Sequence, residues 1–377
     1  MNWIPLNKYY VTGQEIEGIN RVIESGHLSG RGTASLLSEK ALRDLGFNNP
    51  RLTPSCTAAL DAAALFLNIG PGDEVIIPSY TFVATATAFA NRGASIVFAD
   101  SCADHPNIDC SLLESLITPR TKAIVVVHYG GTHCDMETAR AICSKHNIAL
   151  IEDAAHAFLS RKSDGTLLGT DGDIACFSFH DTKNISCGEG GMITRNNDLS
   201  QKEWSVLLNK GTNREAFESG TVNHYEWTGL GGSFGLSELQ AAFLYYQLQF
   251  AEEITNKRRM VWNTLFQELN QLQNEGVLSL PIIKSLKHNA HVFYLELENT
   301  NQVDALIAFM KSRSITCARH YYPLHQSAFG EKFSTGVAPC PNAAGFGESL
   351  LRLPVYSGMS DQDLSRITEG IKSYFKG

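Results

Sequence analysis

The chain has 377 residues, of which 43% are hydrophobic and 19% charged, and its formal net charge is −8. This composition is typical of a soluble globular protein with a large core and excludes a largely disordered chain. The negative charge argues against a nucleic-acid-binding protein, because such proteins usually carry a basic patch.

No apolar run reaches the roughly 18 residues that span a bilayer, and the start of the chain lacks the basic-then-apolar pattern of a signal peptide. We therefore expect no membrane partner and a cytoplasmic location. The nine cysteines are scattered without a CxxC pair, which indicates neither a zinc site nor a disulfide framework.

Strand-like and helix-like segments alternate between residues 50 and 195. Short runs of β-forming residues predict strands at 74–78, 95–100, 122–128, 148–153 and 174–180. Helical spacing with Gly or Asn near the end predicts helices within 57–70, 80–93 and 135–148. This alternation predicts the α/β class, with a mostly parallel central sheet flanked by helices and ligands bound beyond the carboxyl ends of the strands.

The second part of the chain has a different pattern. Residues 235–269 predict one long helix or a kinked pair, and a strand near 291–297, a helix near 303–313, a segment 316–325 and a helix near 361–375 follow. We expect a smaller α+β C-terminal domain. The predicted division is a large domain of residues 1–250 and a small domain of residues 251–377.

The segment FSFHDTKNISCGEGG, residues 177–191, places one lysine just after a predicted strand. A lysine buried among small residues at a strand end can have a lowered pKa and act as a nucleophilic amine. A surface lysine in a turn is the alternative. The glycines after Lys183 favour the first interpretation, because they allow close approach to a bound group and leave room beside the amine.

Three other pieces accompany Lys183. Asp153 ends a predicted buried strand, where a carboxylate either meets a cation or caps the next helix. Ser55 or Thr57 can cap the following helix and leave N–H groups free for a phosphate. Phe82 ends another strand, where core packing is the alternative. Pyridoxal phosphate requires a lysine, a carboxylate at its ring nitrogen, a phosphate cradle and a flat neighbour.

Five motifs in order, PGDEVIIPSYTFVATA, IEDAAHA, FSFHDTKNISCGEGG, LSELQAA and YYPLH, resemble the sugar aminotransferases of the DegT/DnrJ/EryC1/StrS family. The resemblance runs nearly end to end and implies a pyridoxal 5'-phosphate-dependent transferase of fold type I. The segments LTPSCTAAL, PSYTFV, KGTNR and KHNAHVFYLEL resemble most the members that convert dTDP-4-keto-6-deoxyglucose into dTDP-4-amino-4,6-dideoxygalactose.

The resemblance also implies the roles of the residues that hold the cofactor. Lys183 bonds to the cofactor and shuttles the proton, Asp153 pairs with the ring nitrogen, and Phe82 stacks on the ring. The phosphate is bound by the backbone of Cys56 and Thr57 and by the Ser178 hydroxyl. Two positions depart from the pattern: His156 stands where Gln is frequent and is expected to donate toward the phenolic oxygen, and Ser233 stands where an Asn often reaches the neighbouring subunit's cofactor phosphate.

The implied substrate residues belong to two groups. Lys210, Asn213 and Arg214 lie in a loop expected to reach the sugar diphosphate across the interface of a homodimer with shared active sites. His320, Tyr321 and His325 resemble small-domain residues that close over the substrate. The alternative for the loop is a solvated basic turn, and lone histidines are often packed or exposed.

The implied reaction is ping-pong transamination from L-glutamate to a nucleotide-linked keto sugar. Several alternatives stay open: the same chemistry on a 3-keto or UDP- or GDP-linked sugar, the dehydratase branch that replaces the lysine by His, and a non-catalytic regulator that binds a nucleotide sugar. A nicotinamide dehydrogenase is disfavoured, because no GxGxxG follows the first strand.

Overall fold

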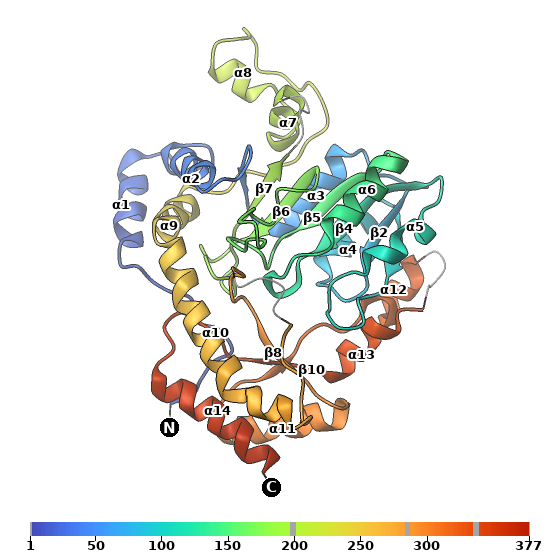
Figure 1. Ribbon diagram of the computed structural model, residues 1–377. Coiled ribbons are helices and arrows are strands. Elements are labelled where there is room, and N and C mark those ends of the chain that lie inside the picture. The colour runs from blue at the N-terminus through green and yellow to red at the C-terminus, as the bar shows by residue number, and fades with distance from the viewer. Residues whose placement is uncertain (1, 197–200, 283–286, 335–338, 377) are drawn as a thin grey trace.

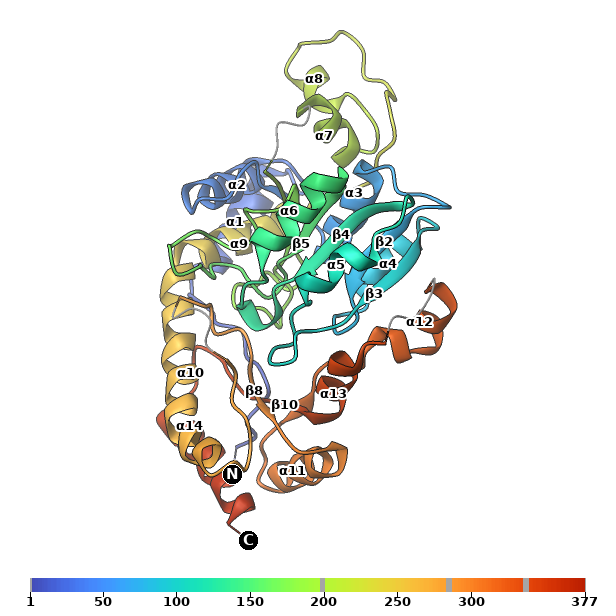
Figure 2. The ribbon, with the colours of Figure 1, turned by 45° about the vertical axis from the view of Figure 1, so that its right-hand side comes forward.

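A computed structural model describes residues 2–196, 201–282, 287–334 and 339–376. Within these residues the strands form one sheet of seven strands and one of three, and the long helix α10 runs from the larger layer to the smaller (Figures 1 and 2). No helix in the described ranges is long and apolar enough to span a membrane.

The larger sheet has a mostly parallel core. Strands β2 to β6 run parallel to one another, and β7 lies antiparallel between β6 and β1. The order across the sheet is β1 (Arg51–Thr53), β7 (Gly191–Arg195), β6 (Ile174–Ser178), β5 (Ala149–Asp153), β4 (Thr121–Val127), β2 (Glu74–Pro78) and β3 (Ser95–Ala99). The predicted α/β class and the five predicted strands are confirmed, whereas β1 and β7 were not predicted.

Alternate residues of the buried strands feed two cores, one on each face of this sheet. Val75 and Ile77 pack with α3 (Cys56–Phe66) and α4 (Ala84–Ala90), while Ile76 between them packs toward α6 (Met136–His146). Helix α5 (Leu113–Leu116) contributes to the second core. Because both faces are covered, the strands are continuously apolar, as parallel strands usually are.

Three helices pack together over the part of the sheet formed by β6 and β7. They are α1 (Glu15–Ser25), α2 (Thr33–Asp44) and α9 (Glu238–Gln249). Leu42 of α2 and Leu244 of α9 share a buried cluster with Phe177 and Met192 of the sheet. The chain then bends at Phe250 into α10 (Ala251–Asn274), so the kinked pair is the form that the structure shows.

The smaller layer is an antiparallel three-stranded sheet covered by helices. Its strands are β8 (Phe293–Glu296), β10 (Leu350–Leu353) and β9 (Ala318–Arg319), and α10, α11 (Thr300–Ser312) and α14 (Asp361–Phe375) pack on it. Ile4 belongs to this core and bonds to the backbone of Ser314 and Thr316, so the N-terminal segment joins this layer. The division at residue 250 stays a prediction.

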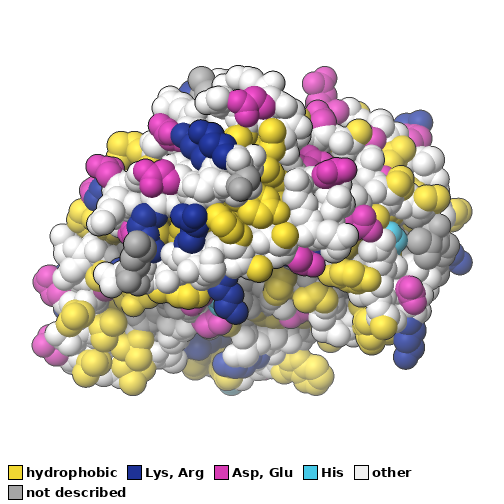
Figure 3. Space-filling view, turned by 90° about the horizontal axis from the view of Figure 1, so that it is seen from below, with side chains coloured by type: hydrophobic (Ala, Val, Ile, Leu, Met, Phe, Trp, Pro, Cys, Tyr) yellow, Lys and Arg dark blue, Asp and Glu magenta, His cyan; other side chains and the backbone are white. Residues whose placement is uncertain are grey.

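The remaining helices lie at the edges of the two layers. Figures 1 and 2 show α7 (Gln201–Leu208) and α8 (Arg214–Glu218) projecting beyond the larger layer, and α12 (Ala328–Phe333) and α13 (Pro341–Ser349) beside β3 and the smaller layer. On the face beneath the smaller layer, cationic and anionic side chains are interspersed among hydrophobic ones (Figure 3).

Candidate active site

A cavity of about 860 Å³ lies between the two layers, at the carboxyl ends of the parallel strands. Its wall combines strand ends and loops of the larger layer with the N-terminal segment and residues of the smaller layer. The predicted site residues that line it are Cys56, Thr57, Phe82, Asp153, His156, Ser178, Lys183, His320 and Tyr321. The structure thus brings together residues separated by up to 265 positions in the sequence. The cavity lies beyond the carboxyl ends of the parallel strands, where ligands of such sheets usually bind.

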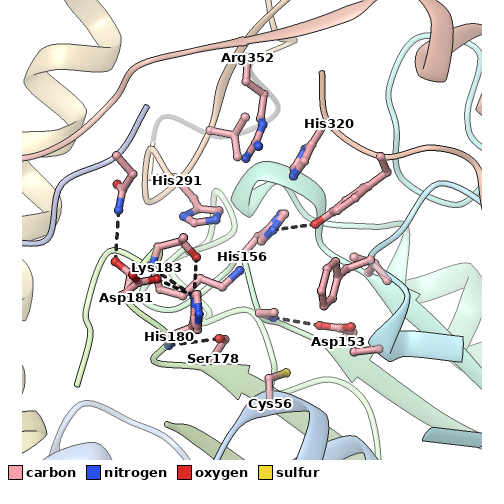
Figure 4. A pocket seen from close by; sticks show the side chains of 18 of the residues that line it. Cys56, Asp153, His156, Ser178, His180, Asp181, Lys183, His291, His320 and Arg352 are labelled. Carbon is pink, nitrogen blue, oxygen red and sulfur yellow. Dashed lines mark hydrogen bonds and ion pairs between the residues drawn. The ribbon is translucent and has the colours of Figure 1, made fainter. Parts of the chain in front are cut away.

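Lys183 lies in the loop after β6 and its side chain faces the cavity (Figure 4). Burial lowers the pKa of its amine to about 8, against the opposing effects of Cys56 and Asp153, and the charge of Arg352 lowers it further. A substantial share of the amine is therefore neutral near pH 8, which is the form that attacks a carbonyl.

Asp153 ends β5 and is 5% exposed. Thr85 donates its hydroxyl proton to Oδ2 at 2.8 Å, and the N–H of Ala155 donates to Oδ1 at 3.1 Å. Burial raises the pKa of the carboxyl, while these hydrogen bonds and Lys183 act in the opposite direction. The carboxylate is held in one orientation, and a bound cationic group would offset the cost of burying its charge.

The N-terminus of α3, where the sequence predicts a phosphate site, lies in the wall of the cavity. Ser55 caps the helix by accepting the N–H of Ala58 at 3.0 Å, which leaves the N–H groups of Cys56 and Thr57 at the helix end. The Ser178 side chain lines the same end of the cavity and is 7% exposed.

Gly191 explains one glycine of the segment that follows Lys183. A Cβ at this position would lie 2.4 Å from the carbonyl carbon of Ser55 and 2.6 Å from the nitrogen of Cys56. The glycine therefore lets β7 run against the start of α3, and the atoms it accommodates belong to that backbone. The sequence predicts that these glycines leave room beside Lys183, whereas at Gly191 the close neighbour is the backbone of α3.

His156 is buried, and burial together with the charges of Lys183 and Arg352 holds its pKa well below the ordinary value. Its Nδ1 accepts the N–H of Gly130 at 3.3 Å, so the proton of the neutral ring is on Nε2, which lies 3.1 Å from the Tyr321 hydroxyl. In the structure His156 therefore orients Tyr321, and its donation toward a bound ring stays a prediction. Phe82 lies at the open edge of the cavity, 56% exposed.

The other predicted residues lie away from this cavity. Lys210 and Ser233 are exposed, Arg214 pairs with Glu218 at 2.7 Å, and the buried Asn213 amide holds its own loop through His224 and Glu226. All four lie within residues 209–233, the segment around α8, which projects from the larger layer (Figure 1). His325 contacts Ser79 at 2.5 Å, just beyond the end of β2.

Three residues of the cavity region escaped the sequence analysis. Thr85, in the first turn of α4, is the donor to Asp153, and its place in the PGDEVIIPSYTFVATA motif was an available signal. His291 and Arg352 line the cavity from the smaller layer. His291 lies in the KHNAHVFYLEL segment but was given no role there, and Arg352 belongs to β10, which was not predicted as a strand.

Comparison with known proteins identifies the family of the chain. The profile of the DegT/DnrJ/EryC1/StrS aminotransferase family matches residues 10–372. The spore coat polysaccharide biosynthesis protein SpsC of Bacillus subtilis is 31% identical over 100% of this chain and 98% of its own length.

Solved structures of aminotransferases share the whole fold. Helicobacter pylori PseC, an aminotransferase involved in the biosynthesis of pseudoaminic acid, superposes with a TM-score of 0.89 at 25% identity and covers 100% of both chains. DesV of S. venezuelae, solved in complex with a ketimine intermediate, gives a TM-score of 0.88 at 27% identity with the same coverage. The fold is fold type I of the pyridoxal phosphate-dependent transferases.

The residues of the cavity fit pyridoxal phosphate. Lys183 would supply an amine for the aldehyde, Asp153 a carboxylate for the ring nitrogen, and the start of α3 N–H groups for the phosphate. This donor set and the family together indicate pyridoxal phosphate as the cofactor. Through its match over residues 10–372, the chain belongs to the DegT/DnrJ/EryC1/StrS aminotransferase family, whose members include sugar aminotransferases.

Proposed function

We propose that the protein transfers an amino group from L-glutamate to a nucleotide-linked keto sugar, with dTDP-4-keto-6-deoxyglucose as the substrate and dTDP-4-amino-4,6-dideoxygalactose as the product. The observation that carries the proposal is the Lys183 amine, with a pKa of about 8, in one cavity with the buried carboxylate of Asp153. The cavity of about 860 Å³ is large enough for a cofactor and part of a sugar.

Pyridoxal phosphate, when bound, supplies an aldehyde that exchanges amines and a ring that withdraws electrons from the neighbouring carbon. The protein supplies proton transfer and orientation. The Lys183 amine, with its lowered pKa, would act as a neutral base that takes a proton from the donor carbon and later delivers one to the sugar carbon. Asp153, which Thr85 holds in place, would keep a proton at the ring nitrogen, and the face from which Lys183 delivers its proton would set the configuration at the sugar carbon.

The relatives support a sugar acceptor. SpsC is named for polysaccharide biosynthesis, and PseC for the biosynthesis of pseudoaminic acid. We propose surface polysaccharide biosynthesis as the pathway. The choice of dTDP and of the 4-keto group rests on the resemblance of the motifs alone, and the same chemistry on a 3-keto or on a UDP- or GDP-linked sugar is the second candidate.

We also propose a homodimer in which each chain completes the other's active site. The segment around α8 carries Lys210 and Arg214 but projects away from the cavity of its own chain (Figure 1). It also bears large exposed apolar side chains, with Trp227 78% and Leu230 63% exposed. A second copy that covers these side chains would receive the two cations at its own cavity. Light scattering combined with gel filtration measures the mass, and a monomer would contradict the shared site.

The proposed reaction is tested with purified protein, pyridoxal phosphate, L-glutamate and dTDP-4-keto-6-deoxyglucose. Mass spectrometry identifies a 4-amino product, and the proton NMR coupling between H3 and H4 separates the galacto from the gluco configuration. Formation of 2-oxoglutarate in an amount equal to the enzyme, without a sugar product, would keep the aminotransferase and exclude this sugar.

The variant Lys183→Ala separates an enzyme from a regulator that only binds a nucleotide sugar. We expect the variant to fold and to lose turnover, because the nucleophile and proton carrier are removed while the core is intact. Turnover equal to that of the natural protein would refute the role of Lys183.

A further inference from the structure

Arg352 brings a cation into the cavity from the smaller layer. It is on β10, where it pairs in register with Tyr294 of β8 and Ala318 of β9. Its side chain lines the cavity on the side of Lys183 opposite Cys56 and Ser178 (Figure 4). Because strands pair with β10 on both sides, the sheet fixes the backbone position that carries this side chain.

Arg352 lacks the partners that other arginines of this layer have. Arg319 pairs with Asp304 at 2.8 Å, and Arg366 pairs with Asp363 at 3.2 Å. Within the described residues, by contrast, no carboxylate forms an ion pair with Arg352, and its Nε is buried without a hydrogen-bond partner. A guanidinium has five N–H donors and no acceptor, so an arginine that lines the cavity without a carboxylate partner in the described residues can bind an anion that is not part of the chain.

The groups around Arg352 cannot neutralise it. Its charge acts on His156, on His320 and on Lys183, and in each case it lowers the pKa of a group that would itself be cationic. The Tyr321 hydroxyl, whose pKa burial raises, stays a neutral phenol. The carboxylate of Asp153 is already held by Thr85 and Ala155.

We propose that Arg352 binds a carboxylate of the amino donor, an assignment that rests on the proposed aminotransferase function. The cavity has two anion-binding ends, with Lys183 between them: the start of α3 takes the phosphate of the cofactor, and Arg352 faces the other side (Figure 4). An amino acid that reacts where the Lys183 amine lies carries its α-carboxylate on the carbon next to the nitrogen. A planar guanidinium is suited to bind such a carboxylate through two N–H groups.

The diphosphate of a nucleotide sugar is the other anion that could meet Arg352. In a 4-keto sugar, however, the reacting carbon and the diphosphate lie at opposite ends of the sugar ring. A diphosphate must therefore be farther from Lys183 than a carboxylate attached to the reacting carbon. This geometry favours the carboxylate of the donor.

The experiment compares Arg352→Gln and Arg352→Lys with the natural holoenzyme and with Arg366→Gln, an arginine of the same layer that lies outside the cavity. Glutarate, a dicarboxylate that cannot react, is titrated by calorimetry, and dTDP is titrated in parallel. We expect Arg352→Gln to raise the Kd of glutarate by about 10- to 100-fold, Arg352→Lys to raise it less, and Arg366→Gln to leave it unchanged. The Kd of dTDP should stay the same in all four proteins.

Two further measurements complete the test. Circular dichroism and the cofactor content show whether Arg352→Gln is folded and loaded, and single turnovers with L-glutamate give kcat/KM for the formation of 2-oxoglutarate. Equal glutarate affinity and equal single-turnover kinetics in Arg352→Gln would overturn the inference, and so would a loss confined to dTDP. If the natural protein itself forms no 2-oxoglutarate, the aminotransferase function fails and the inference fails with it.

Discussion

The close approach of β7 to α3 at Gly191 can be tested by adding one methyl group. Gly191 pairs with Thr53 of β1 and with Ser178 of β6, so strands on both sides hold it in register. In Gly191→Ala the new carbon would lie 2.4 Å from the Ser55 carbonyl carbon and 2.6 Å from the Cys56 nitrogen. Both are backbone atoms, which cannot rotate away as the end of a flexible side chain can.

The size of the effect follows from these distances. Ordinary contact begins at 3.4 Å, so the methyl group is about 1 Å too close and either β7 or the start of α3 must move. Overpacking of this kind costs about 1–3 kcal/mol, and we expect about 3 kcal/mol because backbone is displaced on both sides. The N–H groups of Cys56 and Thr57 would shift with the helix. Loss of one charge-assisted hydrogen bond to the phosphate then weakens cofactor binding by about tenfold or more.

Urea unfolding of the apo-protein and equilibrium dialysis of pyridoxal phosphate measure the two effects. Two glycines without an atom within 4 Å of an added Cβ serve as controls. Gly345→Ala, inside α13, should stabilise by up to about 1 kcal/mol, while Gly188→Ala, with a φ of 84°, should cost about 1–2 kcal/mol. A Gly191→Ala protein with natural stability and natural cofactor affinity would refute the argument from close approach.

Four other outcomes are expected. Because burial lowers the pKa of Lys183 to about 8, the rate at which apo-protein bonds to pyridoxal phosphate should rise about tenfold per pH unit below pH 8 and level off above it. Stopped-flow absorbance measures this rate, and a rate that does not change with pH would contradict the prediction. Thr85→Val removes the donor to Asp153, whose pKa should rise further, and dialysis should show about tenfold weaker cofactor binding; unchanged affinity would exclude this role. Arg214→Ala should raise KM for the sugar nucleotide but leave the glutamate half-reaction unchanged, and an equal loss in both would assign the loop to the cofactor. Burial raises the pKa of Glu152, but hydrogen bonds from His128 and from backbone N–H groups outweigh burial and leave the pKa lowered. Ionised Glu152 therefore stabilises the fold at pH values above the pKa of an unfolded glutamate. This stabilisation is lost as the pH falls through the lower pKa of the folded state. Glu152→Gln should therefore cost about 3 kcal/mol at pH 7 and less near pH 4 in urea unfolding; an equal cost at both would contradict the ionised state.

The large sheet was predictable because its strands carry their own signal. Segments such as Glu74–Pro78 are buried along their whole length, and Asp153 is the last residue of such a strand while Lys183 lies in the loop after another. Helix α2 lacked a signal of this kind. Gly32, at its N-cap, makes no side-chain cap, and the N–H groups of Gly32, Ala34 and Ser35 are accepted by Glu238, about two hundred residues away in the sequence. A helix start that depends on such a distant acceptor cannot be found from local residues.

The same reason explains which parts of the site escaped prediction. Cys56, Lys183 and Asp153 follow from local patterns at helix starts and strand ends. The position of Arg352 at the cavity depends on β10, a four-residue strand that is defined by its pairing with β8 and β9. The orientation of His156 depends on Gly130 and Tyr321, which are 26 and 165 residues away, so its partner could not be read from the sequence around it.

The net charge of −8 describes the chain as a whole and gives no guide to the sign of the field in the cavity. There, Lys183 and Arg352 face the cavity, and Arg352 has no carboxylate partner within the described residues. Keeping a cation partly buried without a partner costs stability in the apo-protein. The ligands expected in this cavity are anions: a phosphate, a carboxylate and a diphosphate. Binding of such anions to the folded state alone offsets that cost, by about 2.7 kcal/mol at a hundredfold excess over Kd, so the stability of this fold and the occupation of its cavity are coupled.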